Sequence, residues 1–171
     1  MAKIYFQFNE RKAIEVIIYL ASRIKNPDIY SICKLLYLAD KTNLEKYGRL
    51  IFGDTYSAME KGATPSNAYN LLKEKPPSTR DSFSVSGYNV SVLREPNLEY
   101  LSKSDLESLD EIINIYENLP NWRKSEDAHD DAWRSSWEKR GHKKSVPIPI
   151  ENIAKLFDNV EELIDYLTHV G

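Results

Sequence analysis

The stretch that decides the fold reads Ile32-Cys33-Lys34-Leu35-Leu36-Tyr37-Leu38-Ala39. Lys34 is its single charge, so a helix here would carry apolar side chains on most of its sides. A helix of this kind lies at the centre of a protein, covered by other elements. Asn26-Pro27-Asp28 precedes the stretch with a capping residue, a proline at the first helical position and an acid in the first turn. The sequence therefore predicts a central, buried helix that runs to about Tyr47, before Gly48.

Elements before and after the central helix in the sequence are expected to pack around it. Asn9 suits the cap of an earlier helix, whose apolar residues recur at helical spacing from Ile14 to Ile24. Alternation around Gly87 in residues 82–95 predicts an antiparallel hairpin. Later helices are expected after Thr64-Pro65-Ser66, from a capping box at Ser104–Glu107 to Tyr116, from Ser125 to Lys139, and near the C-terminus with a restart at Asp158. These elements predict an α+β fold, a predominantly helical single domain over residues 1–171 with a small antiparallel β-hairpin or sheet.

The composition limits the classes of function that the chain can have. A net charge of −3 gives no general attraction to nucleic acid or anionic lipid, so we do not expect DNA binding. No apolar run approaches the roughly 20 residues of a membrane-spanning helix, and the N-terminal residues are too polar for a signal peptide. Cys33 is the only cysteine, which excludes an internal disulfide and suits a reducing compartment. We therefore expect a cytoplasmic protein.

Residues with catalytic or metal-binding chemistry are few and scattered. The six glycines form neither a dinucleotide-binding fingerprint nor a phosphate-binding loop. Cys33 lies within the most apolar helix, where a thiol is usually a small, inert hydrophobe. His129 has acidic neighbours but no second histidine or cysteine at metal-ligand spacing. We therefore expect no catalytic residue, no cofactor and no metal ion.

His129 stands one helical turn before Trp133 and two before Trp137, so a helix would align the three rings on one face. Such stripes usually pack against the core, with the histidine hydrogen-bonded at the edge. A contact patch for a partner is one alternative. A small hydrolase or transferase that uses His129 with Asp130 or Asp131 is another, and a deep pocket around the histidine would favour it.

A series of short motifs runs along the chain. In order, they are Lys34-Leu35-Leu36-Tyr37, Tyr47-Gly48, Asp54-Thr55-Tyr56-Ser57-Ala58, Gly62-Ala63-Thr64-Pro65, Tyr69, Leu101–Leu106 and His129-Asp130-Asp131-Ala132-Trp133. No single motif is specific, but their order and spacing together resemble the SocA-like antitoxin domain, also called the Panacea domain. The resemblance extends from about Ile14 to Trp137. The segment Gly62–Pro65 departs from it, because the family has a Gly-Pro-Val pattern at that turn.

The resemblance implies a function that composition alone does not show. Panacea domains act in toxin–antitoxin systems, so the chain would be an antitoxin that neutralises a cognate toxin by direct protein–protein binding, and not an enzyme. An adaptor that delivers the toxin to a protease is the alternative, with that protease as a second partner. Some relatives carry an added DNA-binding module, for which we expect no room in this chain.

Polar residues around the turns after Gly48 form the expected contact surface. Gly48, Gly53 and Gly62 suit tight turns, where a positive φ is free of Cβ strain. Tyr56 is the expected anchor, since tyrosine offers a large contact area at little entropic cost; a half-buried ring with a locally bonded hydroxyl is the alternative. With the histidine–tryptophan stripe included, the candidate partner-binding residues are Asp54, Tyr56, Glu60, Lys61, Thr64, Asn67, His129 and Trp133.

Overall fold

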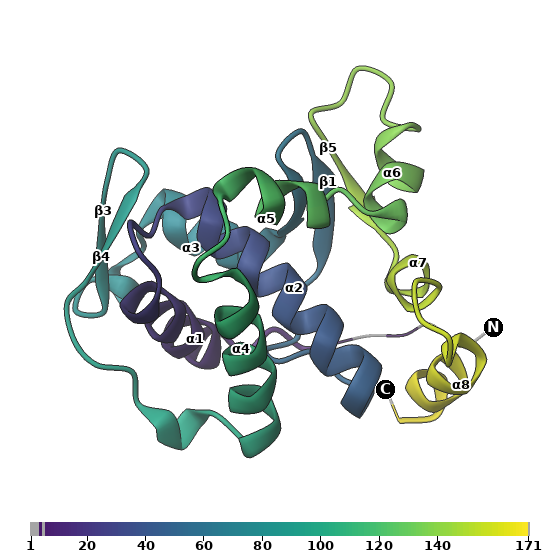
Figure 1. Ribbon diagram of the computed structural model, residues 1–171, viewed down its shortest axis with the longest axis horizontal. Coiled ribbons are helices and arrows are strands. Elements are labelled where there is room, and N and C mark those ends of the chain that lie inside the picture. Colours follow the sequence, from purple (N-terminus) through teal and green to yellow (C-terminus); the bar gives the residue numbers. More distant parts are fainter. Residues whose placement is uncertain (1–3, 5, 171) are drawn as a thin grey trace.

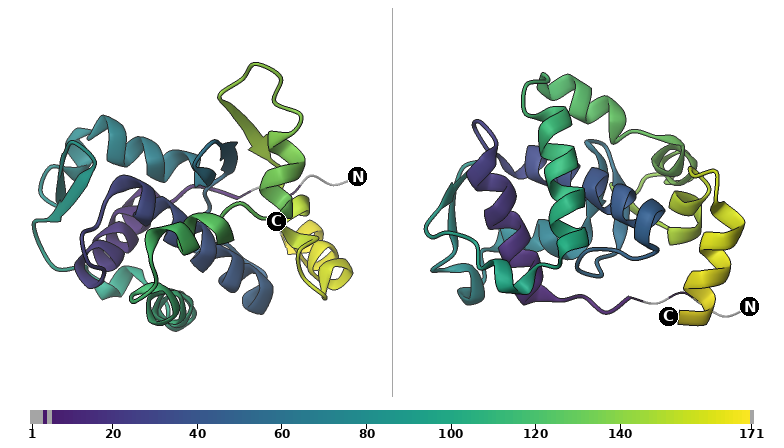
Figure 2. Two further views of the ribbon diagram at one scale, coloured as in Figure 1. Left: turned by 45° about the horizontal axis from the view of Figure 1, so that its top comes forward. Right: turned by 60° about the horizontal axis from the view of Figure 1, so that its bottom comes forward.

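The computed structural model describes residue 4 and residues 6–170. This part of the chain folds into α-helices with two small antiparallel sheets, which confirms the predicted α+β class. The helices are α1 (Glu10–Arg23), α2 (Ile29–Tyr47), α3 (Ser66–Glu74), α4 (Lys103–Tyr116), α5 (Asn121–Asp127), α6 (Asp131–Trp137), α7 (Ile150–Ala154) and α8 (Val160–Val170). The strands are β1 (Tyr56–Met59), β2 (Gly62–Pro65), β3 (Phe83–Ser86), β4 (Asn89–Val92) and β5 (Ser145–Ile148), and short 3-10 turns lie at Pro77–Thr79 and Leu98–Tyr100. The β3–β4 hairpin and the α7–α8 pair lie at opposite ends of the long axis (Figures 1 and 2).

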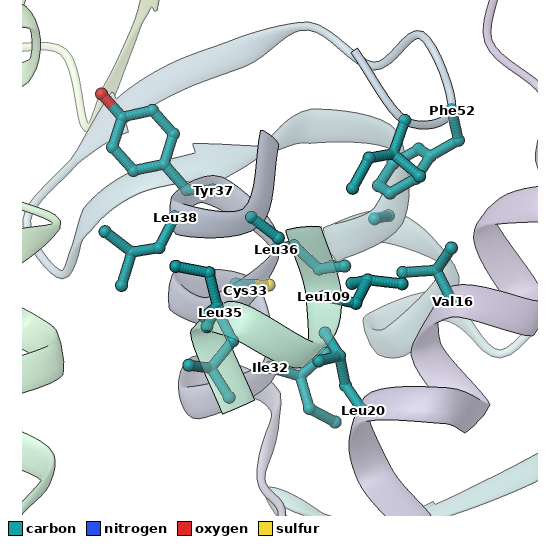
Figure 3. Close-up of a cluster of buried hydrophobic side chains, with 14 of the residues drawn as sticks. Val16, Leu20, Ile32, Cys33, Leu35, Leu36, Tyr37, Leu38, Phe52 and Leu109 are labelled. Carbon is teal, nitrogen blue, oxygen red and sulfur yellow. The ribbon is translucent and has the colours of Figure 1, made fainter. Parts of the chain in front are cut away.

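Helix α2 is the central element, as the sequence predicts. It contacts α1, α3, α4, α5, α7 and β2. Ile32 and Leu36 have no exposed surface, and Figure 3 shows them packed among Val16 of α1 and Leu109 of α4. Cys33 lies in the same core, which confirms that the lone thiol is a packing residue. The apolar circumference of α2 therefore organises the rest of the fold around it.

The boundaries of α2 differ from the prediction at one end only. Its cap is Asp28, whose side chain accepts the main-chain N–H of Ser31 at 2.8 Å. Asn26, the expected cap, instead takes a left-handed conformation with a φ of 51°. The helix ends at Tyr47, before Gly48, as expected. A carboxylate two residues further along thus supplies the cap that the sequence pattern assigned to the asparagine.

The capping box of α4 also lies two residues from its expected position. It is formed by Ser102 and Asp105, each of whose side chains accepts the main-chain N–H of the other. The expected box at Ser104–Glu107 is wrong, because α4 has already begun at Lys103. Asp105 further binds the side chains of Lys12 at 2.6 Å and Arg49 at 2.9 Å, which joins α4 to α1 and to the segment after α2.

The predicted helix from Ser125 to Lys139 is wrong as a single element. The chain forms α5 and α6 with a break between them, and Asp130 lies in the break with an extended backbone. The Asp130 side chain accepts the main-chain N–H of Trp133 at 3.0 Å, so it begins a new helix. Near the C-terminus, the expected restart is present, since α7 ends at Ala154 and α8 begins at Val160.

One sheet follows the prediction and the other extends it. Strand β1 lies between β2 and β5, and both pairings are antiparallel. Gly62–Pro65, expected as a turn, is strand β2. Strand β5 was not predicted, because Pro147 interrupts the apolar pattern; at the edge of a sheet a proline is tolerated. The β3–β4 hairpin forms as expected and is tied to the start of α2 by a hydrogen bond from the N–H of Ile29 to the carbonyl of Tyr88, at 2.9 Å.

Candidate partner-binding surface

Two of the sequence motifs meet inside the protein at Asp130. The Tyr37 hydroxyl donates to Asp130 Oδ2 at 2.6 Å, and the ammonium of Lys41 lies 2.8 Å from the same oxygen. The Tyr37 side chain has no exposed surface, and burial together with the Asp130 charge holds the pKa of its hydroxyl well above the ordinary value. Because Asp130 also caps α6, this carboxylate fastens α6 to α2. The Lys-Leu-Leu-Tyr and His-Asp-Asp-Ala-Trp motifs therefore hold the scaffold together.

Asp54 is a buried residue that positions the start of α3. It is 1% exposed, and its two oxygens accept the main-chain N–H groups of Thr55, Asn67 and Ala68 at 2.8–3.0 Å. The side-chain amide of Asn67 donates to the same carboxylate at 3.0 Å. Burial raises the pKa of Asp54, and these donors act in the opposite direction. Asp54 and Asn67 therefore bind each other, and Asp54 is not the surface contact that we expected.

Tyr56 is also part of the core. Its ring is 3% exposed, and its hydroxyl donates to Asp40 Oδ2 at 2.6 Å. Asp40 is itself buried, and its other oxygen accepts the main-chain N–H of Ile51 at 2.8 Å. Burial raises the pKa of Asp40 to about 7. The alternative of a locally bonded hydroxyl thus describes Tyr56, with deeper burial than we expected, and its ring is not a surface anchor.

His129 and Trp133 clasp the turn between β1 and β2. The nitrogen Nε2 of His129 lies 2.9 Å from the carbonyl oxygen of Glu60, and Nδ1 faces the carbonyl oxygen of Ser125. The indole N–H of Trp133 donates to the carbonyl of Met59 at 2.7 Å. The imidazole packs edge-on against Trp133, which stacks on Trp137, so the three rings do align although His129 lies between two helices. This geometry agrees with the interpretation that the stripe packs against the body of the protein.

The same contacts bear on the hydrolase alternative. Both nitrogens of His129 face main-chain carbonyls, Asp130 is engaged with α2 and α6, and Asp131 pairs with Arg134. Neither acid therefore meets the imidazole as an acid–base pair would require.

Among the described residues, no group of three or more His, Cys, Asp or Glu side chains is placed to hold a metal ion. None of the described helices is both long and apolar enough to cross a membrane.

A surface rich in lysine and tyrosine lies over the first half of α2. We call it the lysine–tyrosine face, and its residues are Tyr30, Lys34, Lys61, Tyr69, Lys73, Lys75 and Tyr88. Lys124 is buried and lines neither hollow, and we count it with the face because its charge acts on Lys34. A hollow of about 20 Å³ lies beside Lys34 and Lys61, and one of about 210 Å³ lies beside Tyr88; Tyr30 and Tyr69 line both, so the surface is continuous. Figure 2 shows α3 and α5 on different sides of α2, so these elements surround its first half.

The tyrosines and lysines of this face are packed against one another. The rings of Tyr30 and Tyr88 lie 5.3 Å apart. The ammonium of Lys61 lies 5.5 Å from the centre of the Tyr30 ring, and that of Lys73 lies 5.2 Å from the centre of the Tyr69 ring. Contacts of this kind are attractive and hold the long side chains near the aromatic surface. The face is therefore a formed surface in which aromatic area and positive charge alternate.

The described residues give the five lysines of the face no ion-pair partner, although the carboxylate of Asp28 attracts Lys34 and Lys124. Burial lowers the pKa of Lys34, the carboxylate of Asp28 acts in the opposite direction, and the ammonium groups of Lys61 and Lys124 lower the pKa further. Elsewhere, Lys12, Lys41 and several other cations do have acidic partners. The result is a local positive region on a chain whose net charge is −3.

The sequence prediction located part of this face. Lys61 lies on it and is exposed, and Thr64 lines the smaller hollow although its side chain is largely buried. Glu60 is exposed on the adjoining β1–β2 turn. Tyr30 and Lys124 were not predicted, because α3, α5 and the hairpin bring them together from segments far apart in the chain. Lys34 was the residue whose sequence context could have indicated this face, since it is the single charge in the apolar stretch from Ile32 to Ala39.

Comparison with known families identifies the domain. The model of the antitoxin SocA-like, Panacea domain matches residues 32–134. The chain belongs to this family. No curated protein and no solved structure matches it. The matched part of the Panacea domain runs from the first half of α2 into α6, so it contains the Asp130 network, the His129 clasp and most of the lysine–tyrosine face. Strand β5 and helices α7 and α8 lie outside the match.

Proposed function

We propose that this protein is an antitoxin that neutralises a cognate toxin by direct, stoichiometric protein–protein binding. Membership of the antitoxin SocA-like family supports a role in a toxin–antitoxin system. The observation that carries the direct-binding mechanism is the lysine–tyrosine face, a formed and accessible surface whose charges have no acidic partners in the described part of the chain. Tyrosine-rich surfaces are favourable for protein binding because the rings bury much area with little loss of entropy.

The internal use of the motif residues agrees with this proposal. The polar atoms of Tyr37, Asp54, Tyr56 and His129 bind other groups of the same chain. Residues that are occupied in this way position the scaffold. A binding protein needs only a rigid scaffold and an exposed face, and both features are present here.

Co-expression with the product of the adjacent gene tests the proposal. The adjacent product alone should stop growth of the host, and growth should return when this chain is produced with it. The two proteins, purified together, should elute as one complex with a fixed ratio in size-exclusion chromatography. An adjacent product that is harmless, or one that stays toxic beside this chain, would contradict the proposal.

The same strains separate direct neutralisation from delivery to a protease. Under direct binding, the amount of toxin in the cell should stay constant or rise when this chain is present. Loss of the toxin in ordinary cells, with its recovery in cells that lack the responsible protease, would instead show that the chain is an adaptor.

A further inference from the structure

Lys124 is a buried cation without a counter-ion. Its side chain is 6% exposed, and the single hydrogen bond that its ammonium makes within the described residues is to the side-chain oxygen of Asn121, at 3.3 Å. A lysine is almost never buried unless it is paired, because removal of an ammonium from water costs free energy. The carboxylate of Asp28 attracts Lys124 but forms no ion pair with it, and its two oxygens accept bonds from the N–H and the hydroxyl of Ser31. The free protein therefore keeps at this position a buried positive charge that no ion pair among the described residues neutralises.

Lys34 and Lys61 make this position more positive. Lys34 is half-buried on α2, and the positive charges of Lys61 and Lys124 repel its ammonium group. With Thr64 and the rings of Tyr30 and Tyr69, Lys34 and Lys61 line the smaller hollow. Like charges that are held together and partly desolvated destabilise the free protein. An anion bound between them would remove this cost, so the arrangement is complementary to carboxylate.

From this geometry, we propose that an acidic segment of the partner protein docks on the lysine–tyrosine face, with a carboxylate between Lys34 and Lys61 at the smaller hollow. The inference rests on the proposed antitoxin function and names the chemistry of the surface that the toxin presents. Side chains flanking that carboxylate lie on Tyr30 and Tyr69, and further acids meet Lys73 and Lys75 in the larger hollow. The partner surface is therefore acidic, with apolar or aromatic residues among the acids.

The features of the face favour an acidic protein over a nucleic acid. The chain carries a net charge of −3, which repels a long polyanion approaching from any other side. The five cations of the face are all lysines, so the face lacks the guanidinium groups that bind phosphates and bases with two bonds. Glu60 and Glu74 are exposed on elements that border it. A protein segment can place its few carboxylates away from these acids, whereas a phosphate backbone cannot.

Charge reversal at exposed positions tests the inference without disturbing the core. The test variant is Lys61→Glu/Lys73→Glu, because both side chains are exposed and make no ion pair among the described residues. The matched control is Lys103→Glu/Lys155→Glu, which changes the net charge equally at exposed positions at the start of α4 and just after α7, elements that do not contribute to the face. A third variant, Lys34→Met, removes the half-buried charge and keeps the length of the side chain. Urea unfolding of each purified variant checks that the fold is kept.

Binding to the purified product of the adjacent gene is measured by titration calorimetry at low and high salt. Lys61→Glu/Lys73→Glu should raise the dissociation constant roughly tenfold or more, and Lys34→Met should also weaken binding, whereas the control should change it less than about twofold. The wild-type affinity should fall as salt is added. Equal affinities for the wild type and both face variants would overturn the inference and leave the antitoxin function intact. Failure of the wild-type protein to bind or neutralise the adjacent product would overturn both.

A short single-stranded RNA serves as the probe of the competing class. The inference expects the wild-type protein to bind this RNA more weakly than it binds the adjacent gene's product. Tighter binding of the RNA, lost in Lys61→Glu/Lys73→Glu while toxin binding is unchanged, would overturn it.

Discussion

Asp130 offers the sharpest test of the scaffold, because one carboxylate serves three groups. Its Oδ1 accepts the main-chain N–H of Trp133 at 3.0 Å, and its Oδ2 accepts from the Tyr37 hydroxyl at 2.6 Å and from Lys41 at 2.8 Å. The change Asp130→Ala removes the cap of α6 and the partner of a fully buried hydroxyl at once. We therefore expect a loss of stability well above that of a typical surface substitution.

The size of the loss follows from the three contacts. Removal of a helix cap costs about 1 kcal/mol. A buried hydroxyl left without its acceptor costs about 1–3 kcal/mol, and the Tyr37 side chain has no exposed surface. The Lys41 pair adds at most about 1 kcal/mol, since both side chains keep some contact with water, at 21% and 14% exposure. The expected total for Asp130→Ala is about 2–5 kcal/mol.

Urea unfolding followed by circular dichroism measures this loss, and Tyr37→Phe provides its control. Tyr37→Phe alone removes the hydroxyl together with its need for an acceptor, so it should cost only about 0.5–1.5 kcal/mol. In the double variant no hydroxyl is left unsatisfied, and its cost should therefore be smaller than the sum of the two single costs. A loss below about 1 kcal/mol for Asp130→Ala, or strict additivity in the double variant, would refute the reasoning.

Two further predictions concern the buried acid Asp40 and two glycines with a positive φ, Gly53 and Gly87. The pKa of Asp40 is raised from 3.8 to about 7 in the folded protein, so between these pH values the folded state binds more protons than the unfolded state. The contribution of Asp40 to the free energy of unfolding therefore falls as the pH rises from about 4 to 7. Asp40→Asn should remove that fall, by at most about 1.4 kcal/mol per pH unit, and should stabilise the protein at pH values above about 7; unchanged pH dependence in urea unfolding would contradict this. Gly53 has a φ of 73° and its added Cβ would lie 2.1 Å from the carbonyl oxygen of Gln7, whereas Gly87 has a φ of 63° and open space around it. Gly87→Ala should therefore cost about 1–2 kcal/mol and Gly53→Ala clearly more, and equal urea midpoints for the two variants would show that the close approach carries no cost.

Most of the fold could be predicted because its signals are local. The apolar circumference of α2, the alternation around Gly87 and the periodicity of α1 and α4 each depend on residues close together in sequence. The errors at helix boundaries arose where more than one nearby side chain could act as the cap. Both Asn26 and Asp28 can cap a helix, and only the tertiary structure shows that Asp28 does so. Strand β5 exists because β1 offers a free edge, which no pattern within residues 145–148 reveals.

The candidate site was harder to predict for a related reason. A tyrosine in a motif can point outward to a partner or inward to a buried acid, and sequence spacing does not distinguish the two. Tyr56 points inward because Asp40, one turn beyond Leu36 on α2, lies within reach of its hydroxyl. The lysine–tyrosine face, in contrast, joins the start of α2 to α3, α5 and two hairpins, so its charge appears only after folding. Lys61 was found because it stands beside a glycine turn that the sequence does mark.

The motif residues inside the protein bind one another, whereas the lysines of the face form no ion pairs among the described residues. This difference predicts how the face variants should behave. Lys61 makes no ion pair among the described residues, and its charge acts unfavourably on that of Lys34. Its replacement removes the cation–π contact with Tyr30 and relieves repulsion of Lys34, and because these effects oppose each other the free protein should unfold at a similar urea concentration. Partner affinity should fall in the same variant. Reduced affinity at nearly unchanged stability distinguishes a binding residue from a scaffold residue such as Asp130, whose loss should lower stability first and binding only as a result. That contrast lets one pair of measurements assign each motif residue either to the fold or to the interaction with the partner.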